Sequence, residues 1–144
     1  MDCDNFEFRA NLVWDGETGG AVNISEFPML KLDTPAKFGG KGRYPCPDEL
    51  FISAIGGCLL TTFLYFKKKL DVHLNELQIS VNGTLEMAGP DGYRICGIDA
   101  KINVGTIEKE KAKVKKCIEL TKKYCHITRA LEKVIPIRIS ERIE

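Results

Sequence analysis

Apolar and polar residues alternate near the start of the chain, as they do in short strands with one buried face. Apolar side chains occupy every second position of residues 6–14, and shorter extended runs follow at 21–25 and 29–32. The segment 15–20 contains three glycines and is typical of a turn, because glycine adopts backbone conformations that other residues avoid. We therefore expect a hairpin followed by a third extended segment.

The longest apolar stretch, residues 50–66, predicts a helix. A proline and two acids at 47–49 suit its first turn, and three lysines at 67–69 suit its negative end. Apolar residues lie on almost every side, a pattern typical of a helix buried centrally. Gly56 and Gly57 each cost about 1 kcal/mol of helix propensity. Another backbone or a substrate is expected to approach closely there, with simple close packing as the alternative.

The second half of the chain predicts three more strands and a further helical region. The expected segments are strands at 74–86 and 93–104 joined by a turn at 89–92, helices at 108–124 and 127–134, and a strand at 135–143. This order of strands and helices predicts an α+β fold. The length predicts one domain, residues 1–144.

Composition and charge narrow the class of protein. The chain is 44% hydrophobic and 28% charged, near the averages for folded proteins. Its 21 basic and 20 acidic residues give a net charge of +1, which disfavours nucleic-acid binding. We expect no membrane-spanning segment, because no run approaches the ~20 apolar residues that cross a bilayer. The first ten residues lack the apolar region of a secretory signal. We expect a soluble, cytoplasmic protein.

Six cysteines offer the main candidate chemistry: Cys3, Cys46, Cys58, Cys96, Cys117 and Cys125. An even number permits disulfides, but a cytoplasmic chain of this length does not need them. No pair has the C-x-x-C spacing of a zinc or thioredoxin motif, so neither a metal nor another cofactor is expected. Cysteines in a reducing compartment are either small core residues or chemically active. Taken singly, most are expected to be core residues.

Two groups of segments are informative together. The first comprises Phe38-Gly39-Gly40, Pro47-Asp48-Glu49-Leu50-Phe51 and Gly57-Cys58, and the second is Tyr124-Cys125-His126-Ile127-Thr128. In these segments the chain resembles the osmotically inducible protein C and organic hydroperoxide resistance (OsmC/Ohr) family. It implies an OsmC-like intertwined homodimer, with a long buried central helix against antiparallel sheets. It also implies an antioxidant, stress-response enzyme, a thiol-dependent peroxidase that reduces organic hydroperoxides. A helix that is apolar on every side in so short a chain independently predicts an obligate homodimer.

By this resemblance, Cys58 is the peroxidatic cysteine and Cys125 the resolving one, so the two should lie close enough to join. A thiolate attacks the peroxide and becomes a sulfenic acid, and a second thiol condenses with it before over-oxidation. A dithiol reductant then reopens the disulfide.

The family stabilises its thiolate with an arginine held by a glutamate, and this sequence departs from that pattern. The position of the glutamate is Asp48, with Glu49 beside it, and the hairpin turn at 15–20 contains no arginine. Arg43 is therefore the first candidate for the cation and Arg129 the second.

Structural alternatives accompany these roles. Asp48 lies about 15 Å along the helix from Cys58, so it either complements the helix N-terminus or acts from a partner's antiparallel helix. Cys58 could be a core cysteine, and His126 is expected to be a structural residue rather than a base. The missing arginine keeps open a redox-sensing or small-ligand-binding module of the same fold without fast turnover. In a third alternative, a purely structural dimer, the two cysteines are coincidental.

Overall fold

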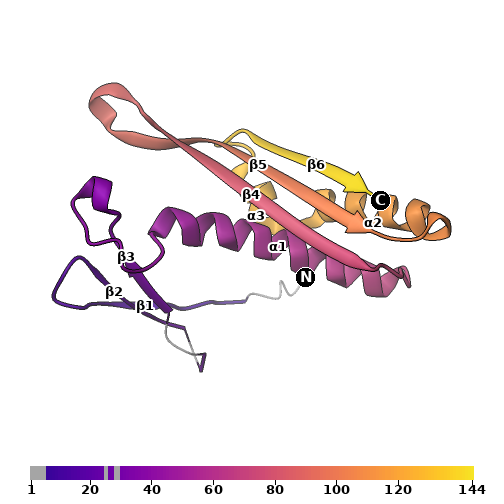
Figure 1. The fold of residues 1–144 in the computed structure, drawn as a ribbon, viewed down its shortest axis with the longest axis horizontal. Helices are drawn as coiled ribbons and strands as arrows, with labels where there is room; N and C mark the ends of the chain where they lie inside the picture. Colours follow the sequence, from indigo (N-terminus) through magenta and orange to yellow (C-terminus); the bar gives the residue numbers. More distant parts are fainter. Residues whose placement is uncertain (1–5, 25, 28–29) are drawn as a thin grey trace, which may run out of the picture. The chain divides into compact units, whose positions relative to one another are not determined.

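The computed structural model describes residues 6–24, 26–27 and 30–144 (Figure 1). It groups the chain into two compact units, residues 1–50 and 51–144. Cys3 and parts of two predicted strands, at Ser25 and Met29, lie outside the described residues. The length predicted a single domain, and the division into two compact units does not test that prediction.

The N-terminal unit contains a three-stranded antiparallel sheet in the order β1-β2-β3. Its strands are β1 (Asn11–Trp14), β2 (Gly19–Asn23) and β3 (Leu30–Asp33), followed by the short 3-10 turn η1 (Ala36–Phe38). The predicted hairpin turn lies between β1 and β2, where Gly16 has a φ of 83°. The first strand is shorter than predicted, because its pairing with β2 ends at Asn11 opposite Asn23.

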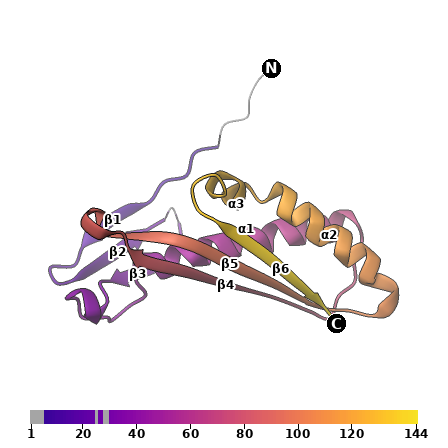
Figure 2. The same ribbon diagram turned by 90° about the horizontal axis from the view of Figure 1, so that it is seen from above.

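The C-terminal unit is a three-stranded sheet with helices on one face (Figures 1 and 2). The strands are β4 (Glu76–Met87), β5 (Tyr93–Gly105) and β6 (Ile137–Ile143), and the 3-10 turns are η2 (Gly89–Asp91) and η3 (Glu108–Glu110). The helices are α1 (Pro47–Lys69), which belongs to this unit from Phe51 onward, α2 (Lys111–Tyr124) and α3 (His126–Leu131). The predicted α+β class is confirmed.

One strand differs from the expected antiparallel arrangement. β4 and β5 form the predicted antiparallel hairpin, but β6 pairs with β5 in parallel. Residues 106–136, which hold α2 and α3, connect these two strands. A crossover of this length returns the chain to the same end of the sheet, so the following strand runs parallel.

The core lies between the sheet and the helices. Every second residue of β5 is buried, from Ile98 to Val104. These side chains pack against Ile55, Leu59 and Phe63 of α1, and against Val114, Cys117 and Ile118 of α2. Buried side chains recur at every second residue of the strand and at every third or fourth residue of the helices, which is the pattern that the sequence predicted.

Helix α1 is buried on one side only within a single chain. Leu64 is 44% exposed and Tyr65 56% exposed on its other side. The sequence predicted no segment long and apolar enough to cross a membrane. By length and composition alone, α1 is long and apolar enough, so that expectation is wrong for this helix. Its packing against the sheet nevertheless makes it a core helix of this unit.

The tandem glycines of α1 have different surroundings. A Cβ added at Gly56 would lie 3.1 Å from Cγ2 of Val81 on β4, whereas one at Gly57 would meet nothing within 4 Å. Gly56 therefore allows close packing of the helix on the sheet. Within this chain, the neighbour that approaches Gly56 is a strand side chain.

Candidate functional site

Cys58 lies on the sheet-facing side of α1 and is 7% exposed. It occupies the same helix face as Ile55, one turn earlier, and packs in a buried cluster with Ala100 of β5 and with Cys125. The structure thus brings together the two cysteines that the sequence singled out.

Cys125 occupies the break between α2 and α3. Its backbone is extended (φ −63°, ψ 104°), so it ends one helix and precedes the next. Its carbonyl accepts hydrogen bonds from the Thr128 hydroxyl and from the Arg129 N–H, both at 3.1 Å. These contacts hold the break in place and keep the Cys125 side chain fully buried.

The environment of Cys125 favours its protonated form. Burial raises the pKa of this thiol above its usual range, hydrogen bonds from Thr128 lower it, and the adjacent Cys58 sulfur raises it again by hydrogen bonding and like charge. A neutral thiol is a weaker nucleophile than a thiolate, but it can condense with an oxidised neighbouring cysteine.

His126 also reaches Cys58. The Cys58 sulfur lies 3.8 Å from Nδ1 and 4.0 Å from Nε2 of the imidazole, and 4.0 Å from the Thr62 hydroxyl oxygen. Sequence reasoning set this histidine aside as structural. Its position directly after Cys125 is the signal that could have identified it.

Arg43 is bound within the N-terminal unit. Its Nε donates to Asp33 at 2.7 Å and its Nη2 to Asp15 at 2.8 Å, while Nη1 pairs with Glu17. These carboxylates raise the pKa of Arg43 further, and its guanidinium holds the pKa of Asp33 well below the usual range. Three carboxylates thus form ion pairs with the Arg43 guanidinium. The predicted role of Arg43 beside Cys58 remains a prediction.

The other predicted residues lie in the first turn of α1 and the last turn of α3. Asp48 and Glu49 are exposed in the first turn of α1, as helix-dipole complementation predicts. A Glu49 carboxylate oxygen accepts the Cys46 N–H at 3.1 Å, which lowers the pKa of Glu49. Arg129 is an exposed residue of α3, whose N–H donates to the Cys125 carbonyl.

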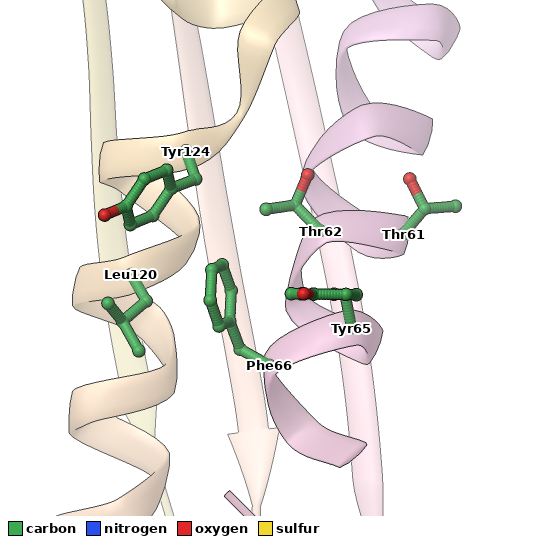
Figure 3. Close-up of a pocket in the computed structure, with 6 residues that line it drawn as sticks. All are labelled: Thr61, Thr62, Tyr65, Phe66, Leu120 and Tyr124. Carbon is green, nitrogen blue, oxygen red and sulfur yellow. The ribbon is translucent and has the colours of Figure 1, made fainter. Parts of the chain in front are cut away.

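A cavity of about 560 Å³ opens one helical turn from Cys58. Thr61, Thr62, Tyr65 and Phe66 of α1 and Leu120 and Tyr124 of α2 line it. Phe66 stands between the two helices, with Thr62 on one side and Tyr124 on the other (Figure 3). Thr62 both lines the cavity and contacts the Cys58 sulfur, so the cavity and the cysteine are neighbours.

No metal centre accompanies these residues. Within residues 6–24, 26–27 and 30–144, no group of three or more His, Cys, Asp or Glu side chains is arranged to hold a metal ion. The polar groups around Cys58 are the Cys125 thiol, the His126 imidazole and the Thr62 hydroxyl.

Comparison with known proteins identifies the relatives of this chain. Residues 40–140 match the family model described as OsmC-like protein. No curated protein matches.

Several solved structures are similar over almost the whole chain. An OsmC-like protein from Mycoplasma pneumoniae is 19% identical, with 98% of each chain covered and a TM-score of 0.78. An organic hydroperoxide resistance protein from Elizabethkingia anophelis is 16% identical, covering 98% of this chain and 99% of its own, with a TM-score of 0.79. The organic hydroperoxide resistance protein OhrB of Bacillus subtilis is 17% identical, covering 95% and 98%, with a TM-score of 0.69. At these identities the likeness concerns the fold.

Proposed function

We propose that this chain, which belongs to the OsmC-like protein family, is a cytoplasmic thiol-dependent peroxidase that reduces organic hydroperoxides. The observation that supports this most is the contact between two thiols in one buried cluster, with a cavity one helical turn away. Some structures of the same fold are named organic hydroperoxide resistance proteins, which is consistent with this substrate class.

The two cysteines have different roles in the proposed reaction. The Cys58 thiolate attacks the outer peroxide oxygen, the O–O bond breaks, and Cys58 becomes a sulfenic acid while the alkoxide takes up a proton to leave as an alcohol. The Cys125 thiol then attacks the sulfenic sulfur, which forms the Cys58–Cys125 disulfide and releases water. An external dithiol reduces that disulfide and is itself oxidised.

The cavity beside Thr62 supports the proposal that organic hydroperoxides are the preferred substrates. Its volume of about 560 Å³ and the side chains of Phe66, Leu120 and Tyr124 suit the apolar part of such a substrate. Hydrogen peroxide has no such part and gains no binding energy there. We therefore expect organic hydroperoxides to react faster than hydrogen peroxide.

The proposal includes a homodimer. Leu60, Leu64 and Tyr65 form an exposed apolar strip on α1, and an exposed apolar helix face is commonly covered by a partner. A second copy of the chain, with its own α1, would cover this strip.

Two serine variants test the proposed reaction. With cumene hydroperoxide and a dithiol, Cys58→Ser should lose peroxide consumption altogether. Cys125→Ser, treated with excess cumene hydroperoxide without dithiol, should react twice at Cys58, first to the sulfenic and then to the sulfinic acid. Mass spectrometry should then find Cys58 as sulfinic acid, because no second thiol captures the sulfenic acid. Cys96→Ser, in a half-buried strand position, is the control and should behave as the parent protein. Full activity in Cys58→Ser would contradict the proposal.

A second function has one observation in its favour. The guanidinium of Arg43 is occupied by three carboxylates, and the family's arginine is missing from the turn at 15–20. A slower redox-sensing or small-ligand-binding module would not need that arginine. Stoichiometric oxidation of Cys58 and Cys125 without sustained turnover in the presence of dithiol would favour this alternative.

A further inference from the structure

We infer that His126 is a catalytic residue: its imidazolium stabilises the Cys58 thiolate and then protonates the departing alkoxide. The first role follows from the contact between His126 and Cys58 alone. The second rests on the proposed peroxidase function.

The position of His126 suits a partner for a thiolate. Both ring nitrogens lie within 4.0 Å of the Cys58 sulfur, and both carry protons in the charged ring. Either nitrogen can therefore donate a proton toward a negatively charged sulfur, as in other thiolate–imidazolium pairs. The ring is exposed while the sulfur is almost buried, so His126 can exchange protons with water and Cys58 remains shielded.

The other groups around the sulfur do not supply a positive charge. From α1 it meets the Thr62 hydroxyl, from the break before α3 the neutral Cys125 thiol, and from β5 the apolar Ile98 and Ala100. In the part of the chain that the structure describes, no hydrogen bond to this sulfur from a lysine or arginine is present. Arg129, the other candidate cation, is exposed on α3, four residues after Cys125.

The break at Cys125 explains how one short segment supplies both groups. In a continuous helix, consecutive side chains diverge by about 100°, so residues 125 and 126 could not both face α1. The extended backbone of Cys125 changes that relation. Cys125 packs beside Cys58 from within the core, and His126 contacts the same sulfur from the solvent side.

In the proposed reaction, His126 handles one proton. The charged imidazole stabilises the Cys58 thiolate before the attack. When the O–O bond breaks, the alkoxide takes a proton from a ring nitrogen, leaving a neutral imidazole, a Cys58 sulfenic acid and an alcohol. Water reprotonates the ring before the next turnover, which the exposure of His126 permits.

Alkylation of Cys58 tests the inference without relying on peroxidase activity. The reduced protein is treated with iodoacetamide across a range of pH, and the labelling of each cysteine is followed by peptide mass spectrometry. His126→Gln, which keeps a polar side chain without the charge, should slow Cys58 labelling near neutral pH about tenfold and move its pH profile upward. His126→Lys, which restores a cation, should recover part of the rate. Arg129→Gln tests the other candidate cation and should slow labelling much less than His126→Gln. Lys133→Gln, at an exposed position just after α3, is the control and should match the parent.

The outcomes separate the two proposals. An unchanged rate and pH profile in His126→Gln would overturn the role of His126, as would an equal slowing in Arg129→Gln. If His126→Gln slows labelling but the parent protein consumes no cumene hydroperoxide, the thiolate pairing stands and the peroxidase proposal fails. If the parent consumes peroxide and His126→Gln does so equally fast, the peroxidase proposal stands and the catalytic role of His126 fails. Protection of Cys117 in every variant shows that the core remains folded.

Discussion

At the scale of single residues, burial and partners separate the cysteines by reactivity. Cys117 is completely buried, its thiol donates to the Phe63 carbonyl at 3.4 Å, and burial raises its pKa to about 11. At pH 7 roughly one molecule in ten thousand then carries a Cys117 thiolate. Iodoacetamide should therefore leave Cys117 unlabelled in the native protein and label it readily after unfolding, as read by peptide mass spectrometry. Native labelling of Cys117 as fast as that of half-buried Cys96 would contradict this.

At the scale of elements, Arg43 joins the β1–β2 turn to the end of β3. It pairs with Asp15 and Glu17 in the turn and with the buried Asp33, which also accepts the Thr18 hydroxyl at 2.6 Å. Because the Arg43 guanidinium depresses the folded pKa of Asp33, this carboxyl stabilises the unit above its unfolded pKa of about 3.9. That stabilisation is lost as the pH falls through the lower folded value.

We therefore expect Arg43→Met to loosen the N-terminal unit at neutral pH, and Asp33→Asn to weaken its dependence on acid. Trp14, the only tryptophan, reports on this unit because its indole N–H donates to the Glu17 carbonyl at 2.8 Å. Its fluorescence under acid and urea titration provides the measurement. Lys41→Met is the control: its exposed pair with Glu17 at 2.9 Å should contribute little. An acid transition identical in the parent and Asp33→Asn would contradict the prediction.

At the scale of the whole molecule, the exposed strip of α1 predicts self-association. Light scattering should give twice the 16.1 kDa chain mass at micromolar concentration. Leu64→Asp places a charge in the strip and should shift the protein toward monomer or aggregate, because burying an unpaired carboxylate is costly. Val134→Asp, at an exposed position outside α1, should leave the mass unchanged. A folded 16.1 kDa monomer for the parent protein would refute the homodimer.

Much of the architecture was readable from local patterns. Alternation in β5, helical spacing in α2 and the glycine-rich turn at 89–92 predicted those elements because side-chain periodicity follows directly from backbone geometry. The family was readable from the residues around Cys58 and Cys125. The parallel pairing of β6 was not, because strand direction depends on where a long crossover returns in space rather than on the pattern of the strand itself.

The candidate site shows the same division between sequence and tertiary structure. The sequence by itself determined which elements form, and it identified Cys58 and Cys125 as candidates for the chemistry. Only the tertiary structure decided which side chains surround the Cys58 sulfur: it put His126 there and joined Arg43 to Asp15, Glu17 and Asp33. Elements are set by interactions between residues near in sequence. The Cys58 sulfur is contacted by a side chain 68 residues away, and that position follows from how the whole chain packs.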